Sequence, residues 1–137
     1  MEKVKYLKVV APWSITVPRK TMKDKKYSIN LNTYRNLDFR VNNNLKILFK
    51  ELMKDQLEGV VLETPVKVRI QIYKPTKRIL DKGNVYGMSA KYLYDAMTDY
   101  GCWEDDNDDF VKSELILPSI HDKGKGRIEF EFKTVEK

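Results

Sequence analysis

Apolar side chains recur at every second position in several segments, which is the pattern of strands with one buried face. The segments 66–73 and 127–133 have this alternation most clearly. The residues expected to point inward are Val66, Val68, Ile70, Ile72, Ile128, Phe130 and Phe132. Residues 4–11 and 110–117 are rich in β-branched and aromatic side chains and predict two further strands.

Two other segments have apolar residues three and four positions apart, which predicts amphipathic helices. The first runs from about 41 to 57, with capping asparagines at 42–44 and Gly59 after its end. The second begins near Asn84 and stops before Gly101. The expected buried residues are Leu45, Leu48, Phe49, Leu52, Met53 and Leu57 in the first helix and Val85, Met88, Tyr92, Leu93, Ala96, Met97 and Tyr100 in the second.

The order of these elements predicts an α+β fold in two layers, in which a mixed β-sheet is covered by two main helices. At 137 residues without a linker, we expect one domain spanning residues 1–137. Two prolines bracket residues 13–17, which predicts an edge strand or an extended loop there. Residues 27–36 have no clear pattern.

The composition narrows the classes of protein. No apolar run approaches the roughly 20 residues that span a bilayer, and the N-terminus has no apolar signal core. We therefore expect a cytoplasmic protein with no membrane partner. Cys102 is the only cysteine and His121 the only histidine, which argues against internal disulfides and against metal sites built on several of these residues.

Charge is unevenly distributed along the chain. Five acids fall within residues 104–109, and removing them from a net charge of +6 leaves +11 on the rest. A basic body with one acidic spot suits a polyanion such as DNA, although an ordinary lysine excess is an equal alternative. The segment 19–26 contains five basic residues and is either a solvated segment or one that binds phosphates.

The stretch from Arg78 to Asp109 places Asp81 before the second helix and the acidic cluster after it. Clustered carboxylates repel each other, so they are either solvated or neutralised by a hard cation such as Mg²⁺. Structural roles are open as well. Asp81 can stabilise the N-terminus of the helix, the cluster can be a solvated turn, and Lys91 can pair with Asp95 one turn later.

From residue 66 to residue 132 the chain resembles the RusA-like Holliday junction resolvases, small dimeric endonucleases common in phages and prophages. The motifs that carry the resemblance are Lys77-Arg78-Ile-Leu-Asp81-Lys-Gly-Asn84, then Lys91, Asp95-Ala-Met97 and Gly101-Cys-Trp103-Glu-Asp105-Asp106, followed by two strands. Two features depart from the family pattern. Gly83 stands where the family has a second aspartate, and the helix is one turn longer.

The resemblance implies a metal-dependent endodeoxyribonuclease that resolves Holliday junctions by symmetric nicks, acts as a homodimer and is encoded by a phage or prophage. It implies Asp81, Asp106 and Lys91 as catalytic residues, with Mg²⁺ (or Mn²⁺) as cofactor. The expected metal ligands are Asp81, Asp106, Asp105 and Asp95, and the expected DNA contacts are Lys74, Lys77, Arg78, Lys82 and Lys91. If Asp81 and Asp106 share a metal, their carboxylates should lie about 4–7 Å apart.

Two other functions stay open at this point. Gly83 in place of an acid is compatible with a branched-DNA-binding protein that has lost catalysis on the same scaffold. The acidic loop is also compatible with an interaction protein that contacts a basic partner.

Overall fold

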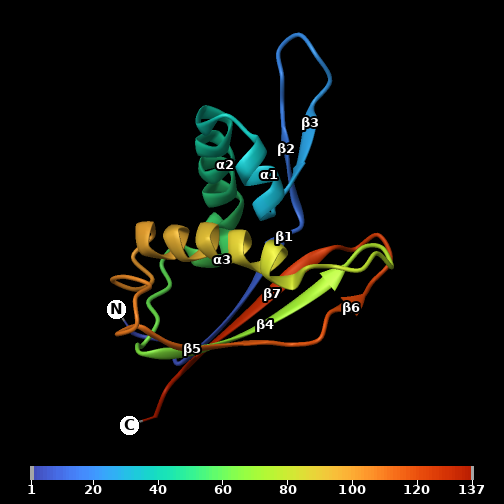
Figure 1. Ribbon diagram of the computed structural model, residues 1–137. Coiled ribbons are helices and arrows are strands. Elements are labelled where there is room, and N and C mark those ends of the chain that lie inside the picture. Colours follow the sequence, from blue (N-terminus) through green and yellow to red (C-terminus); the bar gives the residue numbers. More distant parts are fainter. Residues whose placement is uncertain (1, 137) are drawn as a thin grey trace.

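The computed structural model describes residues 2–136, and its framework is a mixed β-sheet (Figure 1). The strands are ordered β1 (Tyr6–Pro12), β7 (Arg127–Thr134), β4 (Val66–Lys74) and β5 (Val111–Ile116), with the short β6 (Ile120–His121) also beside β4. β7 is antiparallel to both β1 and β4, whereas β5 and β6 are parallel to β4. The expected mixed sheet is confirmed, and β6 is an addition to it.

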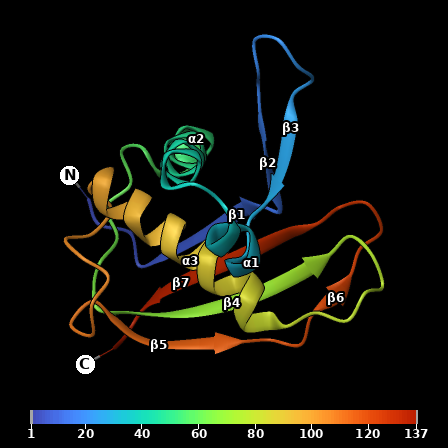
Figure 2. The ribbon, with the colours of Figure 1, turned by 45° about the horizontal axis from the view of Figure 1, so that its top comes forward.

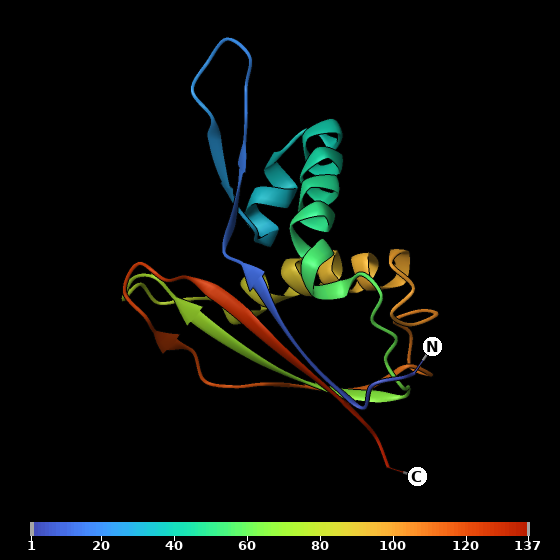
Figure 3. The same ribbon diagram turned by 180° about the vertical axis from the view of Figure 1, so that it is seen from behind.

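The inward faces of the strands follow the alternation in the sequence. All seven side chains expected to point inward from β4 and β7 are buried, with exposures of 0–1%. The alternate residues of these strands lie on the opposite face, which no helix covers (Figure 3). One covered and one uncovered face is the arrangement that alternating strands produce.

Three helices lie on the covered side of the sheet (Figures 1 and 3). They are α1 (Leu31–Asn36), α2 (Phe39–Leu57) and α3 (Lys82–Asp99), and α1 was not predicted because it lies in the segment without a pattern. Within residues 2–136, no helix has the length and apolar character needed to cross a membrane. The α+β class and the two main helices are therefore confirmed.

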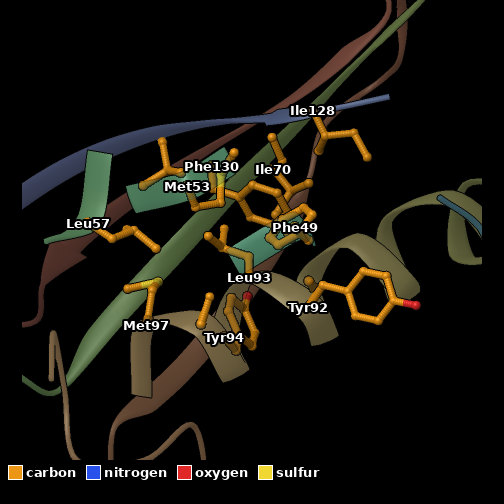
Figure 4. Packing of buried hydrophobic residues seen from close by; sticks show 14 of the residues in the cluster. Phe49, Met53, Leu57, Ile70, Tyr92, Leu93, Tyr94, Met97, Ile128 and Phe130 are labelled. Carbon is orange, nitrogen blue, oxygen red and sulfur yellow. The ribbon is translucent and has the colours of Figure 1, made fainter. Parts of the chain in front are cut away.

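The core forms where α2 and α3 meet the sheet (Figure 4). Phe49 of α2 and Leu93 of α3 are fully buried, together with Phe130 of β7. Leu52 is an exception to the predicted helix stripe, because its side chain is 54% exposed on the outer side of α2.

The structure corrects both helix starts. α2 begins three residues before the predicted asparagines, and its N-cap is Asp38, whose side chain accepts from the backbone N–H of Arg40 at 2.8 Å. The N-cap of α3 is Asp81 and not Asn84. Asx side chains at both caps satisfy N–H groups that have no partner within the helix.

A two-stranded arm projects from the body of the molecule (Figures 1 and 2). It consists of β2 (Ser14–Val17) and β3 (Lys25–Ser28), which pair antiparallel in a separate sheet. We call residues 14–28 the basic arm. Residues 18–26 of its far part are all exposed, and they carry the five basic residues seen in the sequence.

Candidate functional site

Asp81 has a structural role at the start of α3. Its exposed side chain accepts a hydrogen bond from the backbone N–H of Asn84 at 3.4 Å, and its backbone carbonyl accepts from Val85 N–H at 3.3 Å. The carboxylate also lies at the positive end of the helix dipole. The capping alternative for Asp81 is thus confirmed, and the cap still leaves the second carboxylate oxygen available to a ligand.

A hollow of about 440 Å³ surrounds Asp81. Lys74 and Arg78 line it, and the Lys74 ammonium donates to the Arg78 carbonyl oxygen at 3.1 Å. Asn30 at the start of α1 and Trp13 at the root of the basic arm complete the opposite wall. Two of the expected DNA-binding residues therefore share one concavity with Asp81.

Two further expected DNA contacts of this segment, Lys77 and Lys82, are not among the residues that line the hollow. Lys77 is exposed in the loop between β4 and α3, and Lys82 is the half-exposed first residue of α3. In the same loop Ile79 is 98% exposed. The loop thus presents cations and one apolar side chain to the solvent beside Asp81.

The acidic segment 104–109 is an exposed loop folded by its own hydrogen bonds. One carboxylate oxygen of Asp105 accepts from the Asp106 backbone N–H at 2.8 Å, and the other accepts from the Asn107 side chain at 3.2 Å. The side chain of Asn107 in turn accepts from the backbone N–H of Asp109 at 2.9 Å. The turn alternative for this cluster is confirmed in its geometry.

The pKa values of the Asp105 and Asp106 carboxyl groups are shifted in opposite directions. The hydrogen bond from the Asp106 backbone lowers the pKa of Asp105. Partial burial raises the pKa of Asp106, and hydrogen bonding and repulsion from Asp105 add to this, with a further contribution from the charge of Asp95. A cation close to Asp106 would favour its charged form and so oppose this rise in pKa.

Asp95 and Lys91 lie on the exposed side of α3. The carboxylate of Asp95 pairs with the Lys46 ammonium of α2 at 3.1 Å, so the proposed pair with Lys91 is not the one formed. Lys91 is exposed and lines a second hollow, formed with Tyr34 of α1 and Phe39 of α2. α1 lies against α3 (Figure 2), and it contributes Asn32 to the lining of the first hollow and Tyr34 to that of the second.

Asp81 and Asp106 lie toward opposite ends of the molecule, and the expected separation of about 4–7 Å is wrong. An 18-residue helix follows Asp81 and spans about 27 Å. Asp106 lies near its far end, because Trp103 donates to the Thr98 hydroxyl and Asp106 acts on the pKa of Tyr94.

The reason is topological. β4 and β5 are parallel, so α3 must carry the chain back along the whole sheet before β5 begins. Asp81 follows the carboxyl end of β4. The acidic loop lies at its amino end, where Val66 N–H donates to the Phe110 carbonyl at 2.8 Å.

Within one chain, the carboxylates of the two acidic motifs do not lie close enough together to share one Mg²⁺ ion. Across residues 2–136, no group of three or more His, Cys, Asp or Glu side chains is arranged to hold a metal ion. The expected ligands divide into Asp81 at one end and Asp95, Asp105 and Asp106 at the other.

Several contributors to the Asp81 hollow were missed from the sequence. Trp13, Asn30 and Asn32 come from segments about fifty residues or more before Asp81, and nothing local marks them as its neighbours.

Comparison of the chain with models of known protein families and with curated proteins gave no match.

Proposed function

We propose that the protein is a branched-DNA endonuclease that cuts as a pair of chains, with one chain supplying the DNA-binding surface but not a complete catalytic site. The observation that carries the proposal is that Asp81, Lys74 and Arg78 line one hollow at the root of the basic arm. The RusA-like order of the two acidic motifs supplies the reaction class.

Binding to DNA is supported by where the cations lie. Lys74 and Arg78 line the hollow, and the basic arm, which begins beside Trp13, carries five more cations in its far part: Arg19, Lys20, Lys23, Lys25 and Lys26. These side chains would contact phosphates and would position the DNA without reading its sequence. Affinity should then fall steeply as salt rises, because binding releases counterions.

A symmetric pair of chains resolves the separation of the acids. In a pair of chains related by a two-fold axis, Asp81 of one chain could lie near Asp105 and Asp106 of the other. Such a pair has two equivalent composite sites, as an isologous dimer requires. Two sites would also suit a four-way junction, which needs two symmetric nicks.

The decisive experiment uses Asp81→Asn and Asp106→Asn. Each variant alone should bind a synthetic four-way junction and fail to nick it in Mg²⁺. If each site combines the two acids from different chains, a mixed dimer carries one site with both acids mutated and one intact site. Mixing the two inactive variants, after exchange of chains, should therefore restore nicking of one strand.

The result of mixing the two variants distinguishes acids that act within one chain from acids that act across two chains. If both acids acted within one chain, no mixed dimer would contain an intact site and mixing would restore nothing. Wild-type cutting in excess chelator would remove the metal-dependent proposal. Asp108→Asn is the matched control, since it removes an exposed acid of the same loop that none of the motifs uses.

A second candidate is the branched-DNA-binding protein without catalysis. Gly83 in place of the second family acid favours it, as does the lack of a three-acid group in the described part of one chain. Tight, salt-sensitive junction binding with no nicking in Mg²⁺ or Mn²⁺ would select it. If branched DNA gave no gel shift at low salt, both DNA-related functions would be excluded. The hypothesis of an interaction protein that contacts a basic partner would then remain.

A further inference from the structure

The second hollow is lined in part by two aromatic side chains, Tyr34 and Phe39, that do not belong to the buried core. It measures about 400 Å³ and lies between α1, α2 and α3, with Tyr34, Phe39 and Tyr92 in its walls. Asn43, Lys46 and Tyr92 continue into an adjacent hollow of about 200 Å³ along α2 and α3. We call this pair of connected hollows the Phe39 groove.

Phe39 is the clearest anomaly in the groove. It is the first residue of α2 and its side chain is 74% exposed, whereas Phe49 in the same helix is fully buried. Asp38 already caps the helix, so Phe39 is not needed there. Tyr34, across the groove, is 41% exposed. An exposed phenyl ring is an available stacking surface.

Cations flank these rings, while the acids of the groove are already paired. Lys91 lines the groove and, among the residues that the structure describes, forms no ion pair. The guanidinium of Arg40 lies 5.8 Å from the centre of the Phe39 ring. Asp99, which lines the groove, pairs with Lys50 at 3.6 Å, and Lys46 of the groove pairs with Asp95 outside its lining at 3.1 Å. The groove thus combines an aromatic surface with unopposed positive charge.

We propose that the Phe39 groove holds an unstacked nucleobase of the bound DNA, with the base stacked on Phe39 and its phosphate contacted by Lys91. Aromatic rings beside cations are the usual elements of single-strand binding, because every base has a π-face and every nucleotide a phosphate. The inference rests on the proposed DNA-binding function and adds the substrate feature it engages, the unpaired nucleotides at a branch point.

Charge favours a nucleotide over a second copy of the chain. A self-contact centred on Phe39 would bring Lys91 and Arg40 of both copies together, and like charges in contact repel. A phosphate instead gains from both cations. The shape also suits a base, since a groove with two aromatic walls accepts a flat ring more readily than a helix.

The test measures the affinity of Phe39→Ala for a 12-nucleotide single strand and for a blunt duplex of 12 base pairs at one fixed salt concentration. Loss of one stacked base should weaken single-strand binding about tenfold. Duplex binding should change less than about twofold, because phosphate contacts elsewhere remain. Phe39→Tyr, which keeps an aromatic face, should retain the wild-type affinity.

Leu52→Ala is the matched control, because Leu52 is also an exposed apolar residue of α2, at 54%. It should leave both affinities unchanged. Equal binding of the single strand by Phe39→Ala and the wild type would overturn the inference, and so would a change in sedimentation that marks Phe39 as a contact between copies. If the wild type bound neither DNA, the proposed function itself would fail, which is a separate result.

Discussion

The side chain of Asn84 joins two helices: its Oδ1 accepts a hydrogen bond from the backbone N–H of Asn32 at 3.2 Å. Asn84 therefore holds α1 against α3, while its backbone N–H donates to the Asp81 side chain that caps α3. α1 contributes Asn32 to the lining of the Asp81 hollow and Tyr34 to that of the Phe39 groove. The hydrogen bond between Asn84 and Asn32 thus helps to fix the shape of both the Asp81 hollow and the Phe39 groove.

Replacing Asn84 with alanine should loosen α1 selectively. Loss of one hydrogen bond should reduce the free energy of unfolding by about 1 kcal/mol. Amide hydrogen exchange should accelerate in residues 31–36 more than in α2. Asn44→Ala, an exposed position in α2, is the control and should change neither measurement. Equal exchange rates in the two variants would contradict the role assigned to Asn84.

Restoring the missing acid with Gly83→Asp should increase any metal-dependent nicking. A Cβ at Gly83 would meet only an Asp81 carboxylate oxygen, at 3.6 Å, so the new side chain fits beside Asp81. Two adjacent carboxylates should bind Mg²⁺ better than one, and we expect a gain of about tenfold in nicking at limiting metal.

Gly87→Asp provides the matched control, because a Cβ there meets nothing within 4 Å and the position is one turn further along α3. Its nicking rate should stay at the wild-type value. Equal rates for the two variants would mean that the lost family acid does not limit metal binding.

Cys102 should be unreactive in the folded protein. Its thiol is fully buried and donates to the Leu57 carbonyl oxygen at 3.3 Å. Burial raises the pKa of Cys102 to about 11, so almost no thiolate exists at pH 8. A thiol reagent should modify it only in denaturant, whereas an added thiol in Ser113→Cys on β5 should react at once. Rapid labelling of the native wild type would contradict the burial.

Glu129 should make stability depend on acid pH. Burial alone would raise its pKa, but hydrogen bonds from Lys8 and Arg127, with their charges, outweigh burial and lower it. A carboxyl whose pKa is lower in the folded state stabilises the fold above its unfolded pKa of about 4.3. That contribution disappears as pH falls through the lower, folded value.

Glu129→Gln measures this contribution. The variant should be less stable than the wild type by about 1 kcal/mol at pH 7, and the two should converge near pH 2. Urea unfolding at a series of pH values gives the comparison. A difference that stays constant down to pH 2 would show that lost packing, and not ionisation, is responsible.

The parts of the fold that depend on local pattern were predictable from the sequence. Alternation in β4 and β7 and helical spacing in α3 identified the core residues, since these periodicities record which face is buried. Cys102 and Trp103, which closely follow α3, belong to the same core and are 0% and 5% exposed. Leu52 fits the helical spacing but meets no other layer, which a one-dimensional pattern does not reveal.

The relation between the two acidic motifs could not be predicted in the same way. It depends on the parallel pairing of β4 with β5, which neither strand encodes by itself. Had the two strands been antiparallel neighbours joined by a short turn, Asp81 and Asp106 could have met at one edge. Similarly, no local signal connects Trp13 or Asn30 with Asp81, because the hollow is assembled from distant segments.

The two tryptophans of the chain give each end of the molecule its own optical reporter. Trp13 lies in the wall of the Asp81 hollow, whereas Trp103 is buried beside the acidic loop, with its indole N–H 2.9 Å from the Thr98 hydroxyl. With Trp103 replaced by phenylalanine, the remaining emission would respond to DNA entering the hollow. With Trp13 replaced instead, the emission would report on the surroundings of the far loop, so changes at the two ends could be followed separately in one cuvette.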